Sequence, residues 1–285
     1  MTALLDEFGY GPLPEGPLAH RLEALERISA ARWDYRKGRL ERYQAEGESF
    51  PATVDARIRS AARSLGLADR LMPLGQSYDH LLVLGGGVRT MMARAHLTTT
   101  ILRHGVGTTS VAGLGSLRQL DDQGEVARRL GLGECPTEGD AVDEALRHAF
   151  GAALPTDQRS GRTEAGQPWW VRSYLDVRPP VHVLAAPSTR PGQRANTADT
   201  LIGWAELVQS PRVGSRLLLV TTDIFVPFQH CDAVRLLGLP YGCEVETVGF
   251  DNTSNPWVPQ SETFAILQEV RSAIRSMQAL YQAVA

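Results

Sequence analysis

We expect the rest of the chain to be organised around the stretch Leu81-Leu82-Val83-Leu84-Gly85-Gly86-Gly87-Val88-Arg89. Its four consecutive apolar residues predict a buried strand, and the three glycines that follow predict a tight turn. Residues 90–104 then have the composition of a helix. A strand, a glycine turn and a helix together bring main-chain N–H groups close to a phosphate or a carboxylate. Glycine runs also form turns that bind nothing, so both interpretations stay open at this point.

The alternation of strand and helix continues along the chain. We expect further buried strands at residues 108–112, 181–186, 217–222 and 244–250, an additional strand at 169–177 and a surface loop at 155–168. We expect helices at residues 125–130, 137–149, 197–208, 227–237 and 261–284. Such an order predicts the α/β class, with a Rossmann-like, mostly parallel sheet covered by helices on both faces.

The first 76 residues follow a different pattern. Apolar residues recur at helical spacing over about residues 16–46, and again over residues 52–67 after Pro51. We therefore expect an N-terminal helical section over residues 1–76 and a Rossmann-like α/β domain over residues 77–285. The basic residues of the first pattern form either a phosphate-binding face or a solvated helix face, and neighbouring glutamates favour the second. These basic residues are Arg32, Arg36, Lys37, Arg39 and Arg42.

Composition argues against several classes of protein. The 285 residues are 43% hydrophobic and carry a formal net charge of -3, so no basic excess points to nucleic acid or to an anionic membrane as a partner. The three cysteines show no CxxC spacing, which argues against a disulfide framework or a zinc site. No secretion signal and no run of about 20 apolar residues is visible. We expect a soluble, cytoplasmic protein without a metal site.

Loops that leave parallel strands are the expected place for a ligand, because ligands bind beyond the carboxyl ends of such strands. If these loops converge, their arginines would hold a phosphate or carboxylate, and their amide and hydroxyl groups would orient it. The candidate ligand-binding residues are Gly85, Gly86, Gly87, Arg89, Gly113, Ser116, Arg190, Arg194, Asn196, Thr197 and Thr222. Each also has a simpler explanation, as a turn glycine, a helix cap or an exposed loop residue.

Two residues that follow the strand at 217–222 are the candidate catalytic residues. Asp223 could accept a hydrogen bond from a ribose hydroxyl, bind a cation or act as a base, although Asp is also common in turns. His230, near the start of the next helix, could move a proton or be structural. The sequence contains no HExxH, GxSxG or GxxxxGK[ST] motif and no complete GxGxxG motif.

Four short motifs occur in a suggestive order. They are VLGGG with a following Arg and an R-A-x-L helix at 94–97, a small-residue turn at 112–115, N-T-x-x-T at 196–200, and LLVTT at 218–222. In this order the chain resembles the YdcF/SanA/ElyC-like family of bacterial proteins. The resemblance implies a Rossmann-like fold with S-adenosylmethionine as a candidate cofactor, and the loop residues make a nucleotide a second candidate. It also implies a cleft lined by Gly85, Gly86, Arg89, Gly113, Asn196, Thr197 and Thr222.

The chain departs from that family at two positions. The family has a His and, three residues later, an Arg after the V-T-S strand, where this chain has Phe225 and Phe228. If the missing pair performs the family's chemistry, this protein uses His230 instead or has changed function. One hypothesis is therefore a transferase or hydrolase that binds a nucleotide-like or other anionic small metabolite. The other is a non-catalytic ligand-binding or interaction protein, whose N-terminal helices form a partner or homodimer surface.

Overall fold

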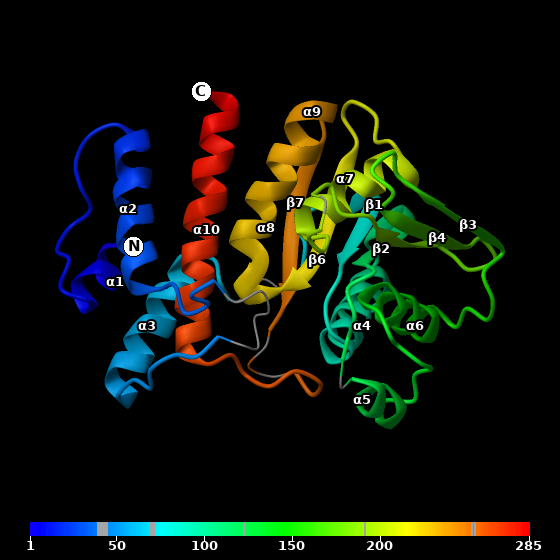
Figure 1. The fold of residues 1–285 in the computed structure, drawn as a ribbon, viewed down its shortest axis with the longest axis horizontal. Coiled ribbons are helices and arrows are strands. Elements are labelled where there is room, and N and C mark those ends of the chain that lie inside the picture. The colour runs from blue at the N-terminus through cyan, green and yellow to red at the C-terminus, as the bar shows by residue number, and fades with distance from the viewer. Residues whose placement is uncertain (39–44, 69–71, 122, 191, 252, 254) are drawn as a thin grey trace.

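A seven-stranded sheet forms the centre of the described part of the protein (Figure 1). This computed structural model describes residues 1–38, 45–68, 72–121, 123–190, 192–251, 253 and 255–285. The parallel strands are β1 (Ser77–Leu84), β2 (Gly107–Ser116), β5 (Val181–Ala186), β6 (Arg216–Thr222) and β7 (Glu244–Phe250). They lie in the order β5-β2-β1-β6-β7, and β3 (Asp157–Arg162) and β4 (Pro168–Tyr174) add an antiparallel hairpin beside β5. The predicted α/β class is confirmed.

Helices cover both faces of the sheet because side chains alternate between the faces along each strand. Leu81 and Val83 of β1 pack in a core with α4 (Val88–Arg103), α5 (Gly124–Arg129) and α6 (Glu138–Phe150). Leu82 and Leu84 face the opposite core. That core contains residues from α7 (Thr197–Leu207), α8 (Val226–Ala233) and the π-helical segment Val234–Gly238, with α9 (Leu239–Tyr241) packed against it.

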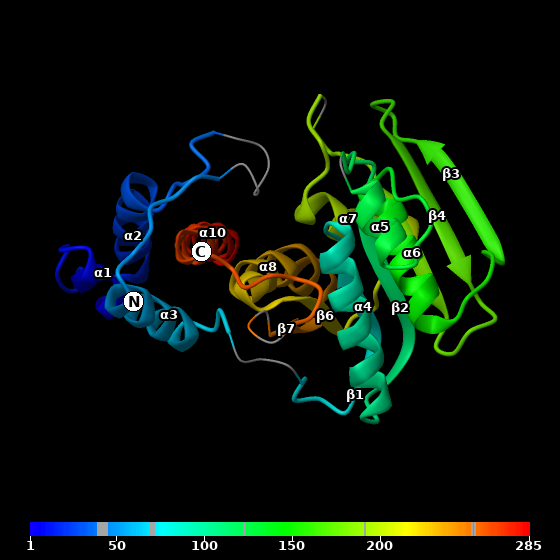
Figure 2. The ribbon, with the colours of Figure 1, turned by 90° about the horizontal axis from the view of Figure 1, so that it is seen from below.

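A third core lies on the β7 side of the sheet. It joins α1 (Thr2–Glu7), α2 (Leu18–Arg32) and α3 (Ala52–Ser64) to α10 (Thr263–Val284). Figures 1 and 2 show α10 between α2 and α8. The domain boundary expected at residue 76 stays a prediction. The helix α10 belongs to the part of the chain after that boundary, and it packs against both α2 and α8. Among the described residues, no helix is long and apolar enough to cross a membrane.

Three local expectations were wrong. The first helical pattern ends at Arg32, because Trp33 and Tyr35 leave the helix and are buried in the third core. Within the expected loop at 155–168, Asp157–Arg162 forms strand β3. This strand lies at the edge of the sheet and is exposed on both faces, so its sequence lacks the apolar alternation by which a strand is recognised.

The small-residue turn expected at 112–115 is part of a strand, since β2 continues to Ser116. Gly113 and Gly115 instead allow α6 to approach the sheet. A Cβ on Gly115 would lie 2.8 Å from the Cα of Gly139, and one on Gly113 would meet the side chain of Leu146. Close helix–strand packing, rather than a turn, therefore requires these glycines.

Gly85 should tolerate no side chain. A Cβ there would lie 2.6 Å from the carbonyl oxygen of Leu114 and 3.0 Å from Cδ of Glu138. We expect Gly85→Ala to lower the free energy of unfolding in urea by about 1–3 kcal/mol, the usual cost of overpacking. Gly124→Ala is the matched control, because a Cβ there meets open space and alanine favours the helix. Equal stabilities of the two variants would contradict the close packing at Gly85.

Candidate functional site

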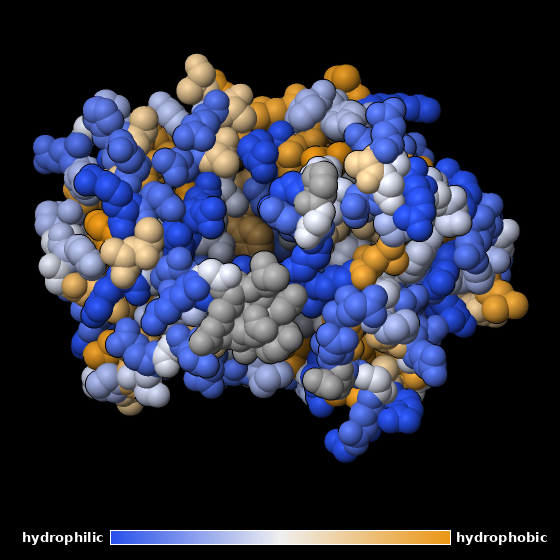
Figure 3. All heavy atoms as spheres, in the orientation of Figure 1, coloured by the Kyte–Doolittle hydropathy of each residue, from blue (hydrophilic) through white to orange (hydrophobic). Residues whose placement is uncertain are grey.

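A cleft of about 720 Å³ opens at the carboxyl ends of β1 and β6. From β1 the chain continues to β2 and β5 on one side of β1, and the later strands β6 and β7 lie on its other side. The strand order therefore reverses between β1 and β6, and ligands bind at such a point in open parallel sheets. Figure 3 shows a hollow near the centre of this face, with mostly hydrophilic residues around it. The volume falls within the range of about 300–1,000 Å³ that is usual for small-molecule sites.

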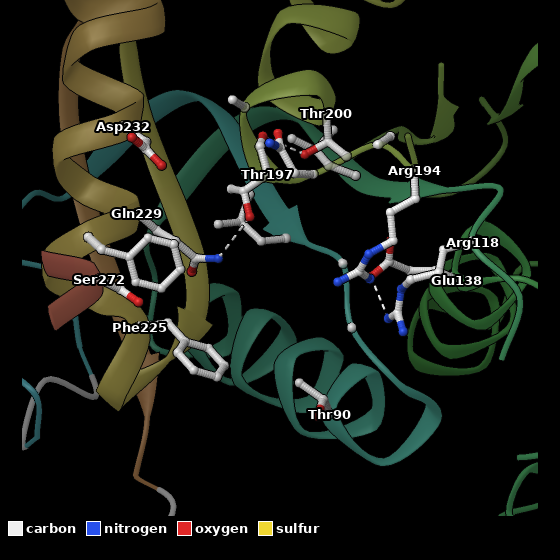
Figure 4. Close-up of a pocket in the computed structure, with 18 of the residues that line it drawn as sticks. Thr90, Arg118, Glu138, Arg194, Thr197, Thr200, Phe225, Gln229, Asp232 and Ser272 are labelled. Carbon is white, nitrogen blue, oxygen red and sulfur yellow. Dashed lines mark hydrogen bonds and ion pairs between the residues drawn. The ribbon is translucent and has the colours of Figure 1, made fainter. Parts of the chain in front are cut away.

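Part of the predicted ligand-binding set lines this cleft. The lining residues from that set are Gly85, Gly86, Gly87, Arg194, Asn196 and Thr197. Asn196 caps α7, since its side chain accepts a hydrogen bond from the Asp199 N–H at 3.0 Å. Gln229 Nε2 of α8 donates to Thr197 Oγ1 at 3.4 Å, which joins α7 to α8 beside the cleft (Figure 4).

Other predicted residues lie outside the described lining. They are Arg89, Gly113, Ser116, Arg190 and Thr222. Arg89 and Arg190 are exposed, and Gly113 lies under α6. Ser116 and Thr222 are buried and hold lining residues in place: Ser116 Oγ donates to Glu138 Oε2 at 2.6 Å, and Thr222 Oγ1 accepts from Arg94. Their predicted direct contact with a ligand stays a prediction.

The two candidate catalytic residues also lie outside the described lining. Asp223 is buried, and its Oδ1 accepts a hydrogen bond at 2.7 Å from the N–H of Ile224, where a single 3-10 turn follows β6. His230 is half-buried, and its Nδ1 lies 3.2 Å from Thr247 Oγ1 of β7. The structure therefore does not bring either residue to the cleft, and their catalytic roles stay predictions.

Arg94 forms part of the cleft floor, although sequence reasoning gave it no role in binding. The residue is 1% exposed. It donates to the carbonyl oxygens of Leu84, at 2.6 Å, and of Gly85, and to Thr222 Oγ1 at 3.0 Å. The available signal was its place on the apolar face of the predicted helix, between Met91 and Thr98 at intervals of three and four residues.

A second group that sequence reasoning missed lies beside the glycine turn. Glu138, the first residue of α6, accepts from Arg118 Nη2 at 3.0 Å as well as from Ser116. Arg118, Glu138 and Arg194 lie on one side of the cleft in Figure 4. Arg118 and Arg194 also line a neighbouring hollow of about 170 Å³, so these two residues lie between the cleft and that hollow.

The opposite wall is formed by α8 and α10. Phe225, Phe228, Gln229 and Asp232 line it from the start and body of α8, and Ser272, Arg275, Ser276 and Ala279 line it from α10. Asp232 Oδ1 lies 3.3 Å from Arg235 Nη2 and 3.2 Å from Ser276 Oγ. Burial raises the pKa of the Asp232 carboxyl above its ordinary value, although these two partners act in the opposite direction.

The N-terminal section also reaches the cleft. Arg36 lines it, while its main-chain N–H donates to Gln268 Oε1 of α10 at 3.1 Å. Its guanidinium lies 3.5 Å from Glu269 Oε1. Of the other basic residues predicted as a face, Arg32 and Lys37 lie outside the described lining, and Arg39 and Arg42 lie outside the described residues.

Positive charge is concentrated in the cleft. Its described lining contains the arginines Arg36, Arg94, Arg118, Arg194 and Arg275 and the carboxylates Glu138 and Asp232. This formal excess of three positive charges contrasts with a net charge of -3 for the whole chain. A cleft whose lining carries an excess of one sign of charge concentrates the field, so this site favours an anion. The described residues contain no group of three or more His, Cys, Asp or Glu that could hold a metal ion.

The buried guanidinium of Arg94 should carry much of the stability of the cleft floor. We expect Arg94→Met to lower the free energy of unfolding by about 2–4 kcal/mol, because two main-chain carbonyls lose a charged donor. Arg89→Met is the control on the same helix: Arg89 is exposed and donates at 3.3 Å to Trp257 O, so we expect a change within about 0.5 kcal/mol. Urea unfolding measures both, and a loss of less than 1 kcal/mol for Arg94→Met would contradict this role.

Comparison with known proteins corrects the expected family. Residues 1–66 match the family described as the Rv3785 N-terminal domain. Uncharacterized proteins Rv3785 of Mycobacterium tuberculosis and Mb3814 of Mycobacterium bovis are each 31% identical over 316 aligned residues, which cover 100% of this chain and 87% of the relative. No solved structure matches. The resemblance to the YdcF/SanA/ElyC-like family was wrong, because short Gly-, Arg- and Thr-containing motifs recur at strand ends in unrelated α/β proteins. This chain belongs to the Rv3785 family.

Proposed function

We propose that the cleft binds an anionic small metabolite that is nucleotide-like or otherwise phosphorylated. The observation that carries this proposal is the set of five arginines that line the cleft. Guanidinium groups suit phosphate and carboxylate because they offer paired N–H donors in a planar fork.

The glycine turn supports the same proposal. Gly85, Gly86 and Gly87 line the cleft and lead into α4, whose N-terminus carries a partial positive charge. Arg118 and Arg194 would contact the anionic group, and Asn196 and Thr197 would orient the rest of the ligand. S-adenosylmethionine fits less well than a phosphorylated compound, because its sulfonium and ammonium groups outnumber its single carboxylate.

We propose binding as the primary function, with a transferase or hydrolase reaction as the second candidate. Phe225 and Phe228 on the cleft wall favour binding without catalysis, since phenyl rings give that wall apolar surface and cannot transfer a proton. Asp232 favours a reaction, because it lines the cleft and its raised pKa suits proton transfer. A reaction at this site would thus depend on Asp232 rather than on Asp223 or His230.

Removing one lining arginine should weaken anion binding. We expect Arg194→Gln and Arg118→Gln each to raise the dissociation constant for pyrophosphate by about 10- to 100-fold in isothermal titration calorimetry, as for the loss of a charged hydrogen bond. Arg190→Gln is the control, because Arg190 lies four residues from Arg194 in the same loop, is exposed and is not a lining residue. Equal affinities of all three variants and the wild type would contradict the proposal.

The raised pKa of Asp232 gives a pH dependence with a definite sign. A carboxyl whose pKa is raised in the folded state lowers stability once pH exceeds its ordinary value near 3.8. We expect Asp232→Asn to raise the free energy of unfolding at pH 7, and we expect the difference to disappear at pH values below 3.8. The exposed Asp176→Asn serves as the control. A lower stability of Asp232→Asn at pH 7 would contradict the prediction.

A further inference from the structure

We infer that the ligand carries a flat aromatic ring beside its anionic group, and that the ring packs on Phe225 at the wall formed by α8. The inference rests on the proposed function and narrows it to one class of ligand: a nucleotide or another phosphorylated heteroaromatic compound.

The aromatic surface formed by Phe225 and Phe228 lies across the cleft from Arg118 and Arg194. Phe225 immediately precedes α8 and is half-buried, whereas Phe228 is 7% exposed, so Phe225 offers the more accessible ring. The two rings pack edge to face, with centroids 5.9 Å apart. In Figure 4, Phe225 and Gln229 lie on the side opposite Arg118 and Arg194.

An anion alone explains neither the size of the cleft nor this wall. A cleft of about 720 Å³ is much larger than one phosphate, and the face of a phenyl ring does not attract an anion. Aromatic side chains do bind bases by stacking, since every base has a π-face. Arg94 Cζ lies 5.9 Å from the centroid of the Phe225 ring, a contact of the cation–π type that helps to fix the ring beside the cleft floor.

Polar groups lie on the same wall as this apolar surface. Gln229 and Asp232 from α8 and Ser272 and Ser276 from α10 line the cleft together with Phe225, so the wall that carries the ring also has amide, carboxyl and hydroxyl groups. An apolar platform with hydrogen-bonding groups at its edge matches a heteroaromatic ring, whose faces are apolar and whose edge carries donors and acceptors. A purely aliphatic phosphate would leave both features unused.

A nested series of probes tests the inference on the intact chain. Isothermal titration calorimetry compares pyrophosphate, ribose 5-phosphate, AMP and UMP. We expect AMP or UMP to bind at least tenfold more tightly than ribose 5-phosphate. We expect Phe225→Ala to weaken that nucleotide by about 5- to 100-fold, the range given by alanine substitution at stacking sites, and to leave ribose 5-phosphate within twofold.

Phe225→Leu is the matched variant, because it keeps an apolar side chain against the third core, which Phe225 also contacts. It should fold with a melting temperature near that of the wild type and still lose most of the nucleotide preference. Saturation-transfer NMR on the wild type gives a second measurement, in which the base protons of AMP or UMP should receive more saturation than the ribose protons.

The outcomes separate the two proposals. Equal affinities for ribose 5-phosphate and both nucleotides would overturn the aromatic subsite and leave the anion site intact. Equal weakening of all phosphates by Phe225→Leu, or saturation confined to the ribose protons, would overturn it as well. If pyrophosphate, ribose 5-phosphate and both nucleotides fail to bind the wild type at millimolar concentration, the proposed function itself fails.

Discussion

The guanidinium of Arg94 lies buried where β1 and β6 end, and it donates to Leu84 O, Gly85 O and Thr222 Oγ1. Taking a cation out of water is costly unless such partners replace the water. These contacts fix the glycine turn against the end of β6 and place a permanent positive charge at the point where the two strands diverge. The other arginines of the lining add to that charge, so the electrostatic character of the cleft follows from the way its floor is built.

The N-terminal helical section also contributes to the cleft, through Arg36 and through its packing against α10. α10 packs between α2 and α8, and it supplies Ser272, Arg275 and Ser276 to the cleft wall. Arg36 reaches the lining from the N-terminal residues that match the Rv3785 N-terminal domain, and it is attached to α10 through Gln268. This N-terminal region therefore supplies one lining residue of the cleft and packs against the helix that forms one of its walls.

Sequence reasoning predicted the parallel strands because buried strands such as Leu217–Thr222 are nearly continuous apolar runs. It missed β3, which is polar, and Arg94, because an arginine in a helix usually reaches solvent. It selected His230 by its nearness in sequence to β6, but the period of 3.6 residues decides which side chains of α8 share a face. Phe225, Phe228 and Asp232 share the cleft face at intervals of three and four residues, whereas His230 contacts β7.

The claim that an anion binds where β1 and β6 diverge can be tested by locating an anion directly. Crystals soaked in tungstate, a phosphate-like anion with strong anomalous scattering, would reveal every such site in one map. We predict the strongest anomalous peak inside the cleft, within hydrogen-bonding distance of Arg194 or Arg118 and next to the turn at Gly86. Strong peaks elsewhere on the molecule, with none in an unobstructed cleft, would contradict it.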